Sequence, residues 1–177
     1  MMKGGRPRSI IVRNAPDGRQ AVIDAKGAGA EFIKVHDGLS REAFFAIAGE
    51  SKKQGLIFVG HVPPLVSAAQ ASDAGQTSID HLQGVLLACS AREGELLKAA
   101  EELSAHPPDQ RVRGIASIQR QTLESFSQDK AASLVAHFQR NQTWQCPTLW
   151  NSRTQLAERA NANVHFGSDQ SSMAAWA

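Results

Sequence analysis

The sequence predicts an α/β fold with a parallel sheet, and three observations support that prediction. Short runs rich in Ile, Val and Phe alternate with longer stretches whose apolar residues recur at helical spacing. Gly or Pro stands at many of the joints between them. The connections are short, and strands joined by a helix run parallel, because parallel neighbours need a crossover that a helix usually provides.

The first strand and helix are predicted by a run of strand-forming residues followed by clear helix boundaries. Residues 30–36 (AEFIKVH) form the strand, and Asp37-Gly38 then turns the chain. Ser40 is a good N-cap for a helix over residues 41–54, whose apolar side chains form one stripe. Two lysines in the last turn, with Gly55 just beyond them, suit the end of this helix.

Two further strands are predicted after this helix. Residues 56–61 (LIFVGH) form a continuous apolar strand, which is typical of strands covered on both faces. Residues 65–74 have helical composition and stop at Gly75. Residues 77–81 (TSIDH) form a third, shorter strand.

The rest of the chain predicts two long helices and further strands. Residues 90–103 and 127–140 have helical composition, and a proline pair breaks the chain between them. Residues 144–149 (WQCPTL) form a fourth strand. We expect another helix over residues 154–160 and a fifth strand over residues 163–166.

Residues that close the apolar runs are the candidates for a functional site, because ligands in parallel α/β sheets bind at the carboxyl ends of the strands. These candidates are Lys34, His36, His61, His81 and Asp169.

Lys34 lies between two β-branched residues that we expect to pack under helices, so it faces the other way, together with His36. Either its aliphatic stem is buried while the ammonium reaches the rim, or the ammonium lies inside and must be paired, neutralised or chemically modified. His36 either lines the same mouth and contacts substrate or begins an exposed loop.

His61 and His81 close the two strands that follow the strand of Lys34. A lone histidine in such a place is more often structural, but all three residues would project into one mouth. Neutral imidazoles are good ligands for zinc and similar divalent ions. The three residues together therefore predict a metal site.

The composition fits a single globular domain over residues 1–177, with residues 1–12 expected to be flexible. The chain has 19 basic and 17 acidic residues, and the basic ones are scattered, so we expect no nucleic-acid partner. Apolar runs fall far short of the roughly 20 residues that span a bilayer, so we expect no membrane association. No secretory signal is recognisable, which favours a cytoplasmic location by default. Cys89 and Cys146 are expected to be buried.

Four motifs give the chain a family resemblance. They are GAEFIKVHDG around Lys34, FVGHVP around His61, SIDHL around His81 and WQCPTL around Cys146. Together they resemble the metal-dependent amidohydrolase superfamily, in its imidazolonepropionase-like and prolidase-like branch, over residues 13–150. That family folds as a TIM (β/α)8 barrel and hydrolyses amide-like carbon-nitrogen bonds, or related ester bonds, with one or two divalent metals.

The resemblance implies a role for each candidate. Lys34 would be the lysine of the fourth strand, carboxylated by carbon dioxide and bridging two metals through its carbamate. His61 and His81 would be the metal ligands of the fifth and sixth strands. Asp169, in HFGSD, would be the eighth-strand aspartate that binds metal and takes the proton from water; alternatively it is a surface turn residue, since only 20 positions separate it from Leu149.

The front of the chain departs from the family pattern. The family's first strand carries a His-x-His pair, which occurs nowhere in this sequence. Only 33 residues precede Lys34, whereas three βα units of about 30 residues each are expected there, and a whole barrel takes about 250 residues. We therefore expect the chain to correspond to about strands 4 to 8 of a barrel, which is incomplete as given. The chain is then either a fragment of a longer gene product or a shortened relative of the family.

The expected function follows from the resemblance and its gap. The chain would be a metal-dependent hydrolase of a small-molecule amide or ester, impaired by the missing His-x-His, with zinc favoured and carbon dioxide bound as the lysine carbamate. A different hypothesis is a non-catalytic half barrel that self-associates into homo-oligomers through open sheet edges. A third makes Lys34 a Schiff-base nucleophile, but leaves His61 and His81 unexplained.

Overall fold

The computed structural model describes residues 10–150, so the predicted helix at 154–160, the predicted strand at 163–166 and Asp169 lie outside the described residues. Residues 12–147 form one compact unit, and the described residues 10, 11 and 148–150 belong to a second unit. The helices and strands below all lie in the first unit.

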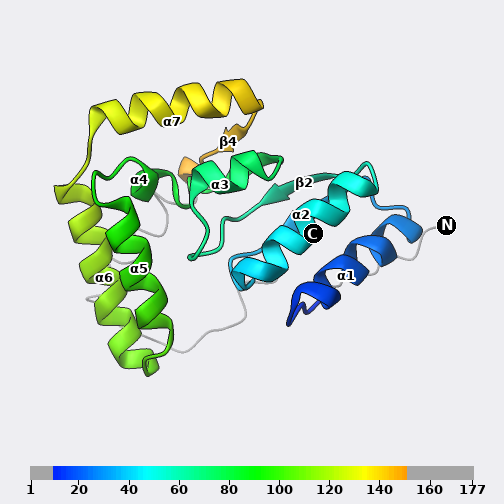
Figure 1. The fold of residues 1–177 in the computed structure, drawn as a ribbon, viewed down its shortest axis with the longest axis horizontal. Helices are drawn as coiled ribbons and strands as arrows, with labels where there is room; N and C mark the ends of the chain where they lie inside the picture. The colour runs from blue at the N-terminus through cyan, green and yellow to red at the C-terminus, as the bar shows by residue number, and fades with distance from the viewer. Residues whose placement is uncertain (1–9, 151–177) are drawn as a thin grey trace. The chain divides into compact units, whose positions relative to one another are not determined.

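Four strands form one parallel sheet in the order β1-β2-β3-β4, with helices in the connections (Figure 1). The predicted α/β class and parallel sheet are thus confirmed. In chain order the elements are α1 (Ala15–Gly27), β1 (Phe32–Val35), α2 (Arg41–Lys53), β2 (Ile57–Gly60), α3 (Ala68–Asp73), β3 (Gln76–Asp80), α4 (Val85–Ala88), α5 (Glu93–Ser104), α6 (Pro108–Glu124), α7 (Gln128–Asn141) and β4 (Trp144–Cys146).

The boundaries of α2 and α7 follow the local chemistry that predicts them. The Ser40 hydroxyl accepts a hydrogen bond from the N–H of Ala43 at 3.2 Å, so α2 begins where expected. Gly55, with a φ of 62°, takes the left-handed conformation just after α2. The Ser127 hydroxyl caps α7 by accepting from the N–H of Lys130 at 3.3 Å.

Three helices, α1, α4 and α6, have no counterpart among the predicted elements. The Asn14 side chain caps α1 by accepting from the N–H of Asp17 at 2.9 Å. The proline pair that predicts a break after α5 also starts α6. Proline is well tolerated in the first turn of a helix, because an N–H there has no intrahelical acceptor. The break and the helix start are therefore the same feature.

Helices cover one face of the sheet and form the core with it. Val35, Phe58 and Ile79, one from each of the first three strands, are buried on this face. Phe44 and Ile47 of α2 pack into the same core, and the Phe44 ring meets the Phe58 ring edge to face at 5.7 Å. Burial of each such large apolar side chain contributes about 1.5 to 3 kcal/mol.

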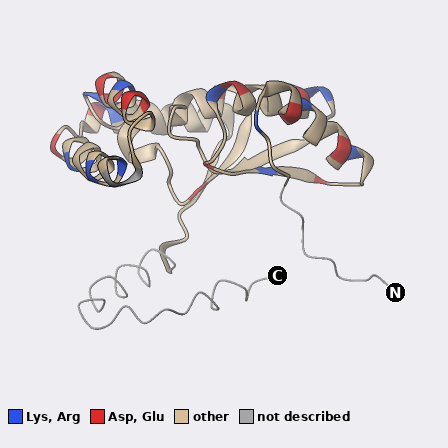
Figure 2. Cartoon of the chain, turned by 90° about the horizontal axis from the view of Figure 1, so that it is seen from below, with Lys and Arg blue, Asp and Glu red and all other residues tan. Residues whose placement is uncertain are grey.

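Within the described residues no helix lies on the other face of the sheet (Figure 2). Phe32, Ile57 and Trp144 on this uncovered face are 53%, 54% and 73% exposed. The continuous apolar strand therefore has one covered face here, not two. Cys146 lies two residues after Trp144 on the same face and is exposed, so the prediction that it is buried is wrong, whereas Cys89 is buried as expected.

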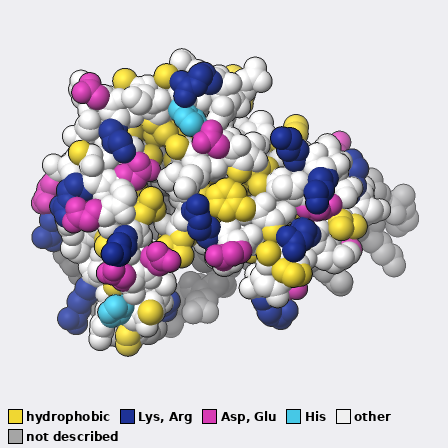
Figure 3. Space-filling model, in the orientation of Figure 1, with side chains coloured by type: hydrophobic (Ala, Val, Ile, Leu, Met, Phe, Trp, Pro, Cys, Tyr) yellow, Lys and Arg dark blue, Asp and Glu magenta, His cyan; other side chains and the backbone are white. Residues whose placement is uncertain are grey.

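Charged side chains of both signs are interspersed on the face drawn in Figure 3. Some of them pair between elements; for example, Lys130 Nζ of α7 lies 2.9 Å from Glu93 Oε2 of α5. Among residues 10–150, no helix is both long enough and apolar enough to cross a membrane.

Gly60 ends β2 in a conformation that requires glycine. Its φ is 117°, and a Cβ atom there would lie 2.3 Å from the carbonyl oxygen of Val35. The same carbonyl oxygen accepts the N–H of His61 at 3.0 Å. The buried side-chain amide of Gln76 donates to the carbonyl of Gly60 at 2.9 Å. Gly60 and Gln76 thus fix the main chain from which the His61 side chain projects.

We expect Gly60→Ala to lower the free energy of unfolding by about 2 to 4 kcal/mol, through the strained φ and the clash with Val35. Urea unfolding followed by circular dichroism measures this. Gly49→Ala is the matched control, because a Cβ at Gly49 meets nothing within 4 Å inside α2, and it should raise stability by up to about 1 kcal/mol. Equal stability of the two variants would contradict the assignment.

Candidate metal centre

Three histidines gather where the carboxyl ends of β1, β2 and β3 meet. His36, His61 and His81 each directly follow the last residue of their strand. The ring centroids of His36 and His61 lie 4.1 Å apart, and those of His61 and His81 lie 4.9 Å apart. The parallel register therefore brings together residues that are far apart in sequence, as the strand-end argument predicts.

His61 is the central and most buried of the three histidines, with only 8% of the residue exposed. Within the described part of the chain its Nδ1 has no hydrogen-bond partner, and Asp37 Oδ1 lies 3.8 Å away. A buried ring nitrogen without a partner costs free energy, and binding a cation would remove that cost.

His81 occupies a strained turn at the end of β3. His81 and Leu82 both have left-handed φ values, 59° and 56°, which are uncommon for residues other than glycine. The N–H of His81 donates to the carbonyl of Cys146 at 2.8 Å, which ties this turn to β4. Strained backbone of this kind often occurs where a side chain must be held for function.

Lys34 is ion-paired. Its Nζ lies 2.7 Å from Asp80 Oδ2, on the uncovered face of the sheet. The Lys34 side chain is 53% exposed, whereas that of Asp80 is 14% exposed. Of the alternatives that the sequence left open for Lys34, this geometry corresponds to a paired ammonium near the rim.

Asp37 joins the loop after β1 to the loop after β3. Its Oδ1 lies 2.5 Å from His36 Nδ1, and its Oδ2 accepts a hydrogen bond from Gln83 Nε2 at 3.4 Å. The side chain of His36 is largely exposed and its ring lies against that of His61. That His36 contacts substrate stays a prediction.

Burial and neighbouring charges shift the protonation of His61 and Asp37. Burial lowers the pKa of His61, and the positive charges of His36, His81 and Lys34 lower it further, against the opposing effect of Asp37. Partial burial alone would raise the pKa of Asp37, but the two neighbouring histidines outweigh it and the net pKa is lowered. At neutral pH the site therefore holds a neutral imidazole beside a carboxylate.

These residues fit a divalent metal by donor type and spacing. His36, Asp37 and His61 form one group of three donors, and His61, Asp80 and His81 form another, each with its ligand atoms within 4.8 Å of one another. Tetrahedral zinc ligands at about 2.1 Å from the ion lie about 3.4 Å apart, so small side-chain rotations would suffice. Three protein ligands with an open fourth position are typical of catalytic zinc.

The strand-end argument identifies Lys34, His36, His61 and His81, which the structure brings to one edge, and it does not identify Asp37 and Asp80. A pattern was present for Asp80, because alternation along β3 puts it on the face that carries Lys34. Asp37 carries no such pattern, since it follows the strand in a turn.

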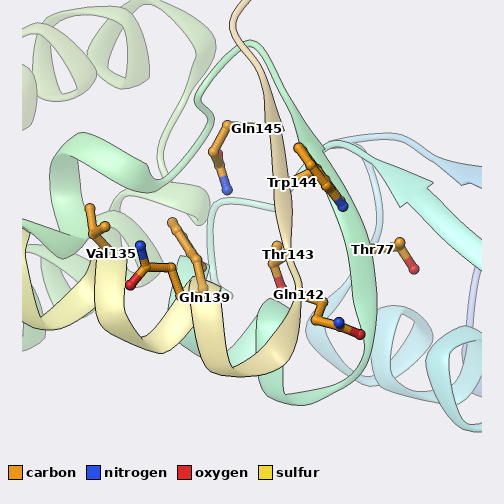
Figure 4. A pocket seen from close by; sticks show the side chains of 8 residues that line it. Thr77, Val135, Gln139, Gln142, Thr143, Trp144 and Gln145 are labelled. Atoms are coloured by element: carbon orange, nitrogen blue, oxygen red, sulfur yellow. The ribbon is translucent and has the colours of Figure 1, made fainter.

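A separate cavity of about 560 Å³ lies between α7 and β4 (Figure 4). It is lined by Thr77, Val135, Phe138, Gln139, Gln142, Thr143, Trp144 and Gln145. Because this lining holds no His, Cys, Lys, Asp or Glu, the cavity offers no acid, base or metal ligand.

No protein-family model matches the chain, and no curated protein matches it. Among solved structures the chain is similar to bottromycin amidohydrolase, with 24% sequence identity and a TM-score of 0.40. The match covers 75% of this chain and 38% of that one, so the chain spans well under half the length of that protein. A TM-score at this level does not establish a common fold.

We expect the pKa of His61 in the metal-free protein to lie below the ordinary histidine value of about 6.5, as measured by NMR titration of the histidine ring protons. Folding favours the neutral form of His61, so the pKa of His61 is lower in the folded state than in the unfolded state. The contribution of His61 to the free energy of unfolding is therefore fully present above the pKa of the unfolded state. It is lost as the pH falls from there through the pKa of the folded state. His61→Gln should reduce the loss of stability over this window. A His61 pKa above 6.5, or an unchanged pH dependence in the variant, would contradict the geometry.

Proposed function

We propose that the chain belongs to a metal-dependent hydrolase of the amidohydrolase type, which acts on amide-like carbon-nitrogen bonds or related esters of small molecules. One observation carries the proposal: two imidazoles, a carboxylate and a lysine meet at the carboxyl ends of three adjacent parallel strands. Catalytic sites of (β/α)8 hydrolases occupy this place. The four motifs of the sequence, in the family's order, support the same proposal.

The proposed larger fold is a (β/α)8 barrel of which this sheet is a part. Its strands follow one another in chain order without reversal, whereas doubly wound sheets reverse order at a switch point. Among the described residues the helices cover one face only, as on the outside of a barrel. Phe32, Ile57 and Trp144 would then face its interior.

His61, His81 and Asp80 are the ligands we propose for the metal, with zinc favoured by the two imidazoles. When bound, a divalent ion supplies Lewis acidity, which polarises a carbonyl and brings the pKa of water toward about 7. Asp37 orients His36 at the mouth, where His36 contacts substrate. Asp169 stays a prediction as the residue that takes the proton from water.

Lys34 would serve as a ligand after carboxylation. Its neutral amine takes up carbon dioxide to form a carbamate and releases one proton. The ion pair with Asp80 must open first, and the new anion then lies beside a second carboxylate. Two like charges this close need a cation between them, so carboxylation and metal binding should depend on each other. Because the sequence has no His-x-His pair, we propose weakened metal binding and impaired activity.

Metal content tests the proposal directly. We expect near-stoichiometric metal by mass spectrometry after purification with zinc and bicarbonate. In His61→Ala we expect the metal affinity to fall at least about tenfold, because loss of a group that only supports a ligand already costs 10- to 100-fold in affinity. His106→Ala is the matched control, since His106 is exposed at the end of α5. Chelator-sensitive hydrolysis of a chromogenic amide or ester should follow the metal.

Wild-type protein without metal, or equal metal in His61→Ala and His106→Ala, would overturn the metal site. Carbamate formation has its own readout, a ¹³C NMR resonance from labelled bicarbonate that is absent in Lys34→Arg. Reduction of a carbonyl adduct on Lys34 by borohydride would favour the Schiff-base hypothesis instead, because a carbamate has no free amine to trap.

The uncovered sheet face supports a second candidate, a non-catalytic scaffold that self-associates. We expect such a scaffold to sediment as a dimer or larger species, and Ile57→Ser with Trp144→Ser to make it monomeric, because both side chains are more than half exposed. Lys98→Ser is the control at an exposed site on α5. A monomeric wild-type chain at micromolar concentration would exclude this candidate.

A further inference from the structure

A second, larger cavity, of about 860 Å³, opens beside the metal-site candidates. Asp37 and Gln83 line it on the side of the site. The segment after β2, the turn after β3 and the helices α4, α5 and α6 supply the rest of its lining. Its volume lies within the range of about 300 to 1,000 Å³ that ligand pockets occupy. We call it the apolar pocket.

Large aliphatic side chains dominate the lining of the apolar pocket. Leu82, Leu86, Ile115 and Leu123 all line it and are all more than one-third exposed. Aliphatic groups gathered in a concave surface and left in water are typical of a ligand site, because covering them is favourable by about 25 cal/mol per Å².

The wall between α5 and α6 is closely packed. A Cβ atom at Gly114 would lie 2.4 Å from Leu103 Cδ1, so the Leu103 side chain of α5 packs directly against α6 at this glycine. Leu103 lines the pocket from α5, and lining residues of α6 extend from Arg111 to Leu123. At a rise of about 1.5 Å per residue, that span is about 18 Å long, so the pocket suits an extended chain.

Two charges give the apolar pocket a polarity. Arg111 brings a guanidinium to the lining, and it makes no ion pair or side-chain hydrogen bond with residues 10–107 or 110–150. Asp37, beside the candidate metal ligands, brings a carboxylate, which is negatively charged at neutral pH as aspartates ordinarily are. An anionic group is therefore attracted to Arg111 and repelled from Asp37.

We propose that the apolar pocket binds the aliphatic chain of an amphiphilic carboxylate, with the carboxylate on Arg111. This proposal rests on the proposed function, and it gives that function a substrate class. The substrates would be amides that carry a medium-length aliphatic chain ending in a carboxylate. The scissile amide then lies on the side of Asp37 and His61, and the carboxylate lies away from it. Arg111 and the aliphatic lining select the substrate, and the metal ligands take no part in that selection.

Binding to the metal-free full-length chain tests this separately from hydrolysis. Isothermal titration calorimetry with octanoate and decanoate, below the concentrations at which they form micelles, should show affinity rising about fourfold for each added methylene at full burial. Arg111→Gln should weaken decanoate binding at least about threefold and leave the neutral analogue decanamide unchanged. Arg113→Gln, an exposed arginine of α6 outside the lining, should change neither.

Ile115→Ser locates the apolar chain, since Ile115 is half exposed and its replacement should leave the fold intact while weakening both ligands. Absence of decanoate binding, equal effects of Arg111→Gln and Arg113→Gln, or loss of binding in Ile57→Ser instead of Ile115→Ser would overturn the proposal. If the chain binds decanoate but takes up no metal when zinc and bicarbonate are supplied, the apolar pocket is supported and the proposed hydrolase is contradicted. Failure of the pocket proposal and failure of the proposed function therefore give different results.

Discussion

The main chain at Gly60 passes so close to the carbonyl oxygen of Val35 that no side chain fits between them. This contact orients the next peptide, whose N–H binds the same oxygen and places His61 against His36 on one side and His81 on the other. The side-chain amide of Gln76 holds the Gly60 carbonyl from β3. The site is thus built on main-chain geometry at the end of a central strand, and its side chains inherit their spacing from it.

Much of the fold follows from local rules in the sequence. Caps at Ser40 and Ser127 and the glycine after α2 act within a few residues, so the ends of α2 and α7 are predictable. The sequence did not reveal α6, because the same prolines that end one helix also start the next. Exposure of Cys146 was unpredictable for another reason: which sheet face is covered depends on packing between distant elements.

The candidate site was predictable to the extent that it depends on topology. Lys34, His61 and His81 lie at strand ends, and parallel strands bring their ends together whatever the loops do. Asp37 and Asp80 acquire their roles from contacts across the fold, 2.5 Å to His36 and 2.7 Å to Lys34 respectively. Such pairings depend on register and on loop conformation, neither of which short-range patterns encode.

The helices α5 and α6 lie between β3 and β4 in the chain yet add no strand to the sheet. They pack on each other and on α4, and the fully buried Leu96 of α5 lies outside the main core cluster. Mutations in this hairpin can therefore accumulate without disturbing the strand ends that carry the histidines. In the proposed hydrolase, such an arrangement would allow the range of accepted molecules to diverge between descendants while the chemistry at the strand ends stays the same.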